Sequence, residues 1–316
     1  MLPSLPIRVL MATCNGAQYL PEQLQSFLDQ TYRNWDLMVG DDGSSDGTPD
    51  LVTEFSRAHP GRLAGLVSGP QKGAGANFLS LVALAAREAP GAALAFSDQD
   101  DVWLPDKLSR AAEWLAAEGA LEGMPLAWSC STILTDACLR PVGESRRFAR
   151  PYSFGNALVQ NILAGNTTVL SPAAAKTLAQ TVPAALDAGV LYHDWWTYQV
   201  LTGAGIRIHH ELEPQVLYRQ HGRNLLGYNG PVRGRLMRLS MVLQREYAGW
   251  ISDNLKALSA NEGLLTPQAR RVLRGFVHAR KQGGVKLAAC LPKLGLCRQT
   301  AQGDRMLRLV ALSGFL

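Results

Sequence analysis

Residues 92–103 read Ala-Ala-Leu-Ala-Phe-Ser-Asp-Gln-Asp-Asp-Val-Trp and join an apolar run to three carboxylates. The apolar part, Ala92–Phe96, is typical of a buried strand, and a helix pattern begins after Trp103. The carboxylates of Asp98, Asp100 and Asp101 repel one another, and a bound cation would offset that repulsion. Oxygen ligands suit Mg²⁺ or Mn²⁺, ions that commonly clamp the diphosphate of a nucleotide substrate. An acidic, solvated turn is the alternative explanation.

Short apolar runs alternate with amphipathic stretches over the first 120 residues. This order predicts an α/β fold, with a mostly parallel sheet covered by helices on both faces. In such sheets ligands bind beyond the carboxyl ends of the strands, where the polar motifs of this chain also lie. The predicted strands are Ile7–Thr13, Trp35–Val39, Leu63–Ser68 and Ala92–Ser97, and the predicted helices are Leu20–Leu28, Thr48–Ala58, Asn77–Ala89 and Pro105–Glu118.

The pattern is weaker after residue 120, and helical spacing dominates from Val232 onward. We therefore expect two units, an α/β domain over residues 1–230 and a basic helical region over 231–316. The elements predicted in between are strands at Leu126–Leu134, Asn166–Leu170, Ile206–His209 and Gln215–Tyr218, a loop at Arg140–Tyr152, and helices at Ala173–Gln180 and from Tyr192.

Charge is divided unevenly along the chain. Residues 1–230 hold 16 Lys and Arg against 22 Asp and Glu, whereas residues 231–316 hold 15 against 4, a net charge of +11. Such asymmetry suggests an anionic partner for the second segment, such as a membrane face, a phospholipid-like substrate or nucleic acid. No platform of interleaved aromatic residues accompanies the arginines, so nucleic acid is not expected. Solvated arginines on surface helices are the alternative explanation.

Cysteine usage and hydropathy favour the cytoplasm. The chain has five cysteines and no Cys-x-x-Cys, so neither a disulfide framework nor a thiolate zinc site is predicted. The sequence enters a strand pattern near Ile7 without a charged and apolar leader, and no apolar run reaches the roughly 18 residues of a membrane span. We expect a cytoplasmic protein that contacts the inner face of the cell membrane peripherally through residues 231–316.

The segment Asp41–Thr48, Asp-Asp-Gly-Ser-Ser-Asp-Gly-Thr, resembles a calcium loop in part. Thr53 occupies the position where a calcium loop needs a bidentate Glu, and a strand precedes the segment, so this interpretation is rejected. The alternatives are a helix-capping turn and a strand-end turn whose carboxylates accept hydrogen bonds from a nucleoside.

Four motifs together resemble the family 2 glycosyltransferases, over roughly residues 7–228. They are Ala12-Thr-Cys-Asn-Gly16, Val39-Gly-Asp-Asp-Gly-Ser-Ser-Asp-Gly-Thr48, Lys72-Gly-Ala-Gly-Ala-Asn-Phe78 and Phe96-Ser-Asp-Gln-Asp-Asp-Val-Trp103. The resemblance implies a GT-A fold and inverting sugar transfer from a nucleotide-sugar donor. The Asp-Gln-Asp-Asp-Val-Trp variant is similar to the rhamnosyltransferase-like branch, as are His193-Asp-Trp-Trp196 and Tyr218-Arg-Gln-His-Gly-Arg-Asn224.

The resemblance also implies roles for residues near the donor. Thr13 and Asn15 resemble the loop that contacts the nucleoside, and Asp42, helped by Asp41, resembles the carboxylate that reads the pyrimidine ring. The remaining implied positions are Asn77 at the donor, Asp98 near the ribose, Asp100 at the metal and Asp101 as an orienting residue. Cys14 departs from the family, which often has an aromatic or other apolar residue there, so base stacking at this position is not expected.

Asp194 is the candidate base. Inverting transfer needs one group to deprotonate the acceptor hydroxyl, and a carboxylate at a helix start stays ionised beside the helix dipole. The neighbouring Trp195 and Trp196 are expected to bind sugar faces. The alternative is a helix-capping Asp followed by two core tryptophans, but the upstream motifs favour the base.

The segment after Gln215–Tyr218 carries Arg219, His221 and Arg223. A neutral His can complete a metal site with Asp100, and Arg suits bidentate contact with a diphosphate. The resemblance places His221 where related transferases bring a His or basic residue to the leaving group.

The expected function is metal-dependent, inverting glycosyl transfer with Mg²⁺ or Mn²⁺. The expected donor is dTDP-L-rhamnose or a similar nucleotide sugar, and the expected acceptor is a cell-surface polysaccharide or a lipid-linked oligosaccharide. Two other classes of protein are the alternatives to a glycosyltransferase. A sugar nucleotidyltransferase would carry a Gly-rich loop with Arg and Lys near the N-terminus, which residues 12–16 lack. An inactive nucleotide-sugar-binding module would lack the base or a metal ligand.

Overall fold

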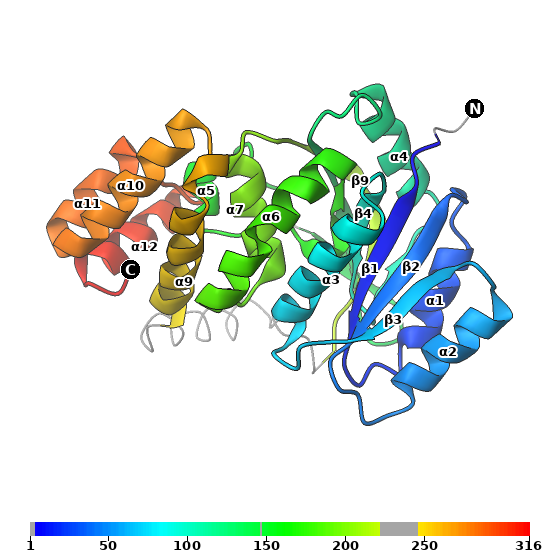
Figure 1. The fold of residues 1–316 in the computed structure, drawn as a ribbon. Helices are drawn as coiled ribbons and strands as arrows, with labels where there is room; N and C mark the ends of the chain where they lie inside the picture. The colour runs from blue at the N-terminus through cyan, green and yellow to red at the C-terminus, as the bar shows by residue number, and fades with distance from the viewer. Residues whose placement is uncertain (1–3, 146, 222–245) are drawn as a thin grey trace.

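The computed structural model describes residues 4–145, 147–221 and 246–316. These residues form one mixed sheet with helices on both faces and a helical lobe at one end (Figure 1). The strand order is β3-β2-β1-β4-β8-β6-β9-β5, and β7 pairs with β6. The strands are β1 Ile7–Thr13, β2 Trp35–Asp41, β3 Leu63–Ser68, β4 Ala93–Ser97, β5 Val102–Trp103, β6 Leu126–Thr135, β7 Pro141–Glu144, β8 Val169–Leu170 and β9 Arg207–Arg219.

The parallel part of the sheet is β3-β2-β1-β4, in agreement with the βαβ pattern of the sequence. Side chains alternate between its two faces, since Val9 and Met11 enter one apolar core whereas Leu10 and Ala12 enter the other. The helices over this part are α1 Leu20–Leu28, α2 Thr48–Ala58, α3 Ala74–Glu88 and α4 Lys107–Ala117. Burial on both faces explains why β1, β2 and β4 appear as continuous apolar runs in the sequence, whereas β3 at the sheet edge is only partly buried.

The second half of the sheet differs from the predicted elements in three places. The predicted loop at 140–152 contains β7, which Pro141 opens at a sheet edge, where its missing N–H breaks no interior ladder bond. The two strands predicted around residues 206–218 are one strand, β9, parallel to β6. The predicted strand at 166–170 is a 3₁₀ turn, η1 Gly165–Thr167, followed by the short β8.

The remaining helices lie on one side of the sheet and in the lobe. Those near the sheet are α5 Phe154–Ala157, α6 Pro172–Ala188 and α7 His193–Gly203, and those of the lobe are α9 Glu246–Ala260, η2 Glu262–Leu264, α10 Pro267–Gln282, α11 Gly284–Lys293 and α12 Ala301–Leu312. The larger apolar core runs without interruption from Leu10 and Phe78 through α6 and α7 to Leu258 and Phe276 of the lobe. The predicted boundary at residue 230 and the start of the predicted helical region lie outside the described residues.

Candidate active site

Three loops meet at the carboxyl edge of β1, β2 and β4. The parallel register aligns Thr13 with Asp41 and Met11 with Ser97, so the polar segments that follow these strands lie side by side. This convergence agrees with the sequence-based expectation for a parallel sheet.

The loops after β1 and β2 are tied together by side chains predicted to hold the nucleoside. The hydroxyls of Thr13 and Ser44 both donate to Asp41 Oδ1, at 2.9 Å and 2.6 Å. Asn15 has a left-handed backbone with φ of 51°, and its Oδ1 accepts from the Ser45 N–H at 2.8 Å. Asp41 and Asn15 therefore fix the shape of these loops, whatever ligand contacts they make.

Asp42 and Asn77 both anchor backbone near the same edge. The two carboxylate oxygens of Asp42 accept N–H groups of Gln71 at 2.6 Å and Gly73 at 2.8 Å. The buried amide of Asn77 donates to Gly40 O at 2.7 Å. The ligand contacts predicted for both side chains stay predictions, and the geometry adds a supporting role for each.

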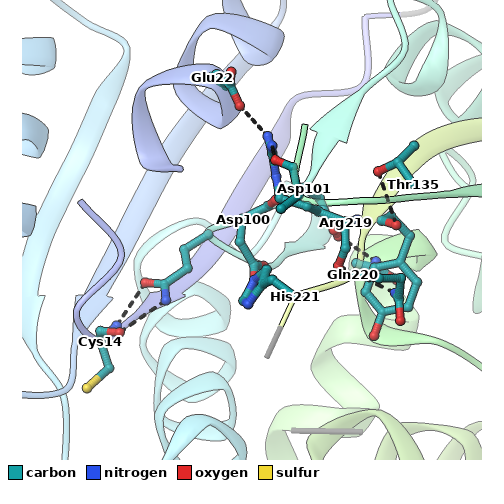
Figure 2. A network of polar contacts seen from close by, with 12 residues as sticks. Cys14, Glu22, Asp100, Asp101, Thr135, Arg219, Gln220 and His221 are labelled. Carbon is teal, nitrogen blue, oxygen red and sulfur yellow. Dashed lines mark hydrogen bonds and ion pairs between the residues drawn. The ribbon is translucent and has the colours of Figure 1, made fainter. Parts of the chain in front are cut away.

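Gln99 connects the acidic loop to the loop after β1, a role that sequence reasoning missed. Its Oε1 accepts from the Cys14 N–H at 2.9 Å and its Nε2 donates to Cys14 O at 3.1 Å, as the dashed lines at Cys14 in Figure 2 mark. A Cβ at Gly16 would lie 2.2 Å from Gln99 Oε1, so glycine is required there for this bridge.

Asp98 and Asp194 approach one another from different elements. Burial raises the pKa of Asp98 well above its usual value, and the charges of Asp101, Asp100 and Asp194 raise it further. His193, the first residue of α7, packs on Phe96 at 5.2 Å between ring centroids, and Phe96 lies two residues before Asp98. The first turn of α7 therefore lies beside the start of the acidic loop. This packing supports the prediction that the base and the ribose-binding carboxylate share one site.

The close approach of η1 fixes the position of Asp194. A Cβ at Gly165 would lie 3.3 Å from Asp194 Cβ and 2.5 Å from His193 Nε2. Asp194 Oδ1 accepts from the Trp195 N–H at 2.7 Å. Burial raises the pKa of Asp194 to about 6, although hydrogen bonds from Trp195, Asn161 and Gly165 oppose the shift. A carboxylate with this pKa is ionised at neutral pH and is a better proton acceptor than an ordinary Asp.

The aromatic residues around Asp194 are structural. Trp195 and Trp196 are buried, and their ring N–H groups donate to Ala157 O at 2.6 Å and Thr181 Oγ1 at 3.0 Å. The expectation that these rings bind sugar faces is therefore wrong, because the core covers them. His193 stacks on Phe78 at 3.9 Å between ring centroids, and burial lowers its pKa to about 3, so its ring is neutral.

Asp100 and His221 form the candidate metal pair. Asp100 Oδ2 lies 2.6 Å from His221 Nε2, and the His221 ring stacks on Tyr19 at 4.9 Å between centroids. Figure 2 shows both side chains side by side below Arg219. The two atoms share a hydrogen bond, and a divalent ion in place of its proton would take a carboxylate oxygen and an imidazole nitrogen as neighbouring ligands.

Asp100 and His221 are the part of a coordination shell that the described residues supply. In the described part of the chain, no group of three or more His, Cys, Asp or Glu side chains is arranged around a metal position. Mg²⁺ is usually held by one or two protein ligands together with substrate phosphates and water. The pair therefore fits a metal shared with a diphosphate better than a closed structural site.

Arg219 is buried among groups of the protein, and the diphosphate contact predicted for it stays a prediction. Its buried guanidinium pairs with Glu22, as Figure 2 shows. It also donates to Asp100 O at 2.8 Å and Ala137 O at 2.6 Å, and it lies over the Tyr19 ring. These contacts favour a positioning role beneath the acidic loop. Arg223, the other predicted diphosphate contact, lies outside the described residues.

Asp101, Asn166 and Lys107 form a buried network behind the acidic loop. Asp101 accepts from the Asn166 amide at 2.5 Å and from the Arg219 N–H at 3.1 Å, and Lys107 Nζ donates to Asn166 O at 2.6 Å. Burial raises the pKa of Asp101 to about 7 and lowers that of Lys107 to about 7. Asp101 therefore orients the loop, in agreement with its predicted role. Asn166 and Lys107 were missed because their partners are distant in sequence.

The loss of Arg219 is expected to destabilise the fold. Arg219→Met would leave the carbonyls of Asp100 and Ala137 without their donor in a buried place, which costs about 2–4 kcal/mol in the free energy of unfolding. Urea denaturation measures this effect. Arg110→Met is the matched control, because Arg110 pairs with Glu211 and Glu213 at the surface and its loss should cost under about 1 kcal/mol. Equal losses in the two variants would contradict the positioning role.

Residues 8–124 match the family described as Glycosyl transferase family 2. The chain is also similar to the "dTDP-rhamnosyl transferase RfbG" of Shigella flexneri, with 27% identity over 79% of this chain and 84% of that protein. A shorter match, 38% identical over 32% of this chain and 38% of the relative, is to the "UDP-Glc:alpha-D-GlcNAc-diphosphoundecaprenol beta-1,3-glucosyltransferase WfgD" of Escherichia coli.

Two solved structures share the whole architecture. The S. aureus TarS 1–349 structure has a TM-score of 0.51 at 15% identity and covers 98% of this chain and 92% of its own. The mannosyltransferase PcManGT from Pyrobaculum calidifontis, solved in complex with GDP-Man and Mn²⁺, has a TM-score of 0.50 at 19% identity and covers 99% and 88%. The fold is therefore GT-A, and residues 8–124 carry the match to glycosyltransferase family 2.

Proposed function

We propose that this glycosyltransferase moves L-rhamnose from dTDP-L-rhamnose, with inversion, onto a cell-surface polysaccharide or a lipid-linked oligosaccharide. The alignment with a dTDP-rhamnosyl transferase across most of both chains supports the donor. The relative named for a diphosphoundecaprenol-linked substrate supports a lipid-carried acceptor.

The observation that carries the mechanism is the packing of the start of α7, which bears Asp194, against Phe96 at the end of β4, which leads into Asp98. The acceptor hydroxyl attacks the anomeric carbon while the bond from that carbon to the diphosphate oxygen breaks. Asp194 accepts the proton of the hydroxyl, and the nucleoside diphosphate leaves with the electron pair of the broken bond. The raised pKa of Asp194 matches it to this proton transfer at neutral pH.

The donor is held by the three loops. Asp42 and Asp98 would accept hydrogen bonds from the nucleoside, while Thr13, Asn15, Asp41 and Asn77 keep the loops in place. Asp100 and His221 would hold Mg²⁺ or Mn²⁺, and such an ion, when bound, neutralises charge on the departing diphosphate. The Mn²⁺ that accompanies GDP-Man in the PcManGT complex is consistent with this assignment.

The basic helical lobe is the part of the enzyme that we expect to contact a membrane. No helix among the described residues is long and apolar enough to cross a membrane. We propose a cytoplasmic enzyme with an α/β domain over residues 1–230, whose basic region 231–316 rests peripherally on an anionic membrane beside a lipid-carried acceptor.

A donor panel tests the proposed function. With dTDP-rhamnose, UDP-glucose, UDP-GlcNAc and GDP-mannose as donors, release of nucleoside diphosphate should be at least about tenfold faster from dTDP-rhamnose. Product analysis should show the sugar on the added acceptor. Pyrophosphate formed from a sugar phosphate and a nucleoside triphosphate would indicate a nucleotidyltransferase instead. Donor binding without any release would indicate an inactive binding module.

A further inference from the structure

Four large apolar side chains face water on the outer surface of the helical lobe. Val285 on α11 is 75% exposed, and Leu309, Leu312 and Met306 on α12 are 57%, 48% and 46% exposed. We call these four residues the outer patch. Isolated exposed apolar residues are ordinary, but a contiguous group marks an interaction surface.

Helix geometry places the outer patch on one surface. On α12 the buried Leu307 and Ala311 face the lobe, so Met306, Leu309 and Leu312, spaced three residues apart, lie on the opposite side. A Cβ at Gly284 would lie 3.5 Å from Leu312 O, so the start of α11 adjoins the end of α12 and brings Val285 into the group. This surface belongs to the end of the molecule opposite β1–β3 (Figure 1).

Cations surround the outer patch. Lys286, Lys293, Arg305 and Arg308 are exposed on the same two helices, and within the described residues no ion pair involves any of them. The only acid between residues 284 and 312 is Asp304, which pairs inward with Arg150 at 2.8 Å and accepts from the Arg298 N–H. The surface is therefore both apolar and positively charged.

Charge complementarity decides which partner fits this surface. A second copy of the chain docked on the same patch would bring four cations against four cations. An anionic bilayer offers phosphates to the lysines and arginines and acyl chains to the apolar residues, as in helices that lie in a membrane interface. We propose that α11 and α12 insert the outer patch into an anionic membrane. This inference rests on the proposed function, because a lipid-carried acceptor gives the contact its purpose.

Vesicle flotation of the full chain tests the proposal. The wild type should float with vesicles of phosphatidylcholine mixed with phosphatidylglycerol and much less with phosphatidylcholine alone. The double variants Leu309→Ser with Leu312→Ser, and Arg305→Glu with Arg308→Glu, should each weaken binding at least about tenfold. Matched controls change exposed residues elsewhere: Leu186→Ser with Leu212→Ser, and Arg57→Glu with Arg87→Glu, which should float like the wild type.

The outcomes separate this inference from the proposed function. Diphosphate release in the absence of vesicles should be unchanged in all four double variants, since none alters the active site. If the wild type floated with the vesicles but released nucleoside diphosphate from none of the donors, the proposed function alone would be refuted. Equal flotation of patch and control variants would overturn the membrane contact. The membrane contact would also be overturned if the wild type sedimented as a dimer, the patch variants sedimented as monomers, and all of them floated equally well.

Discussion

Replacing Asp194 with Asn is expected to lower the rate of sugar transfer by about a thousandfold, because the acceptor hydroxyl loses its base. Asn keeps the size of the side chain but cannot accept a proton. Affinity for the donor should stay within about threefold of wild type, since Asp194 acts on the acceptor. Steady-state kinetics with donor and acceptor varied separately measure both effects.

The same residue predicts the pH dependence of the wild type. Burial raises the pKa of Asp194 to about 6, so the base becomes protonated and the rate falls as the pH drops through about 6. Because this pKa lies above that of an exposed Asp, ionisation of Asp194 opposes folding at neutral pH. Asp194→Asn should therefore unfold at the same or a higher temperature than wild type. A lower transfer rate in this variant would then reflect loss of the base and not loss of folding.

A matched control for this variant is Asp187→Asn, which changes an exposed Asp near the end of α6. It should retain wild-type kinetics. An Asp194→Asn enzyme that keeps more than about a tenth of the wild-type rate would exclude Asp194 as the base.

The second large effect is expected at Asp100. Asp100→Ala should lower the transfer rate by about a hundred- to a thousandfold, because the ion that would stabilise the departing diphosphate loses a ligand. Donor affinity should fall as well, in contrast to Asp194→Asn. Chelation of divalent ions from the wild type should remove activity, and added Mn²⁺ or Mg²⁺ should restore it.

Metal binding itself gives a readout that does not depend on turnover. Titration of Mn²⁺ in the presence of nucleoside diphosphate should show weaker binding in Asp100→Ala and in His221→Gln than in wild type. Asp106→Asn is the control, since Asp106 lies at the surface before α4 and contacts Thr31. Full wild-type activity after chelation would refute a metal role for the Asp100–His221 pair.

The sheet was largely predictable from the sequence because its central parallel strands, β1, β2 and β4, are buried on both faces. Ile7–Thr13 and the run before Asp98 are uninterrupted apolar segments that end in polar motifs, and such segments leave little choice of structure. The meeting of the loops after β1, β2 and β4 then follows from parallel geometry. The approach of Asp194 to the acidic loop does not follow from periodicity, and only the family resemblance pointed to it.

The contacts that the sequence did not predict join residues far apart in the chain. Asn166 stands in the sequence as part of an Asn-Thr-Thr glycosylation pattern, but it bonds to Asp101, 65 residues earlier. Gln99 reaches Cys14 across 85 residues. Trp195 and Trp196 follow a candidate base in the sequence, but helix geometry turns both into the core. Local patterns carry no information on such pairings, because tertiary packing decides them.

The uninterrupted core beneath α6 and α9 limits how this enzyme can be recombined with its relatives. A chimaera joined after the sheet would have to match the apolar face of the incoming α9, which includes Leu258, to that of the resident α6, which includes Leu178 and Val182. Mismatched volumes would leave holes or clashes, which commonly cost several kcal/mol. Engineering new specificity is therefore better attempted by exchanging loops at the sheet edge than by swapping the two halves of the chain.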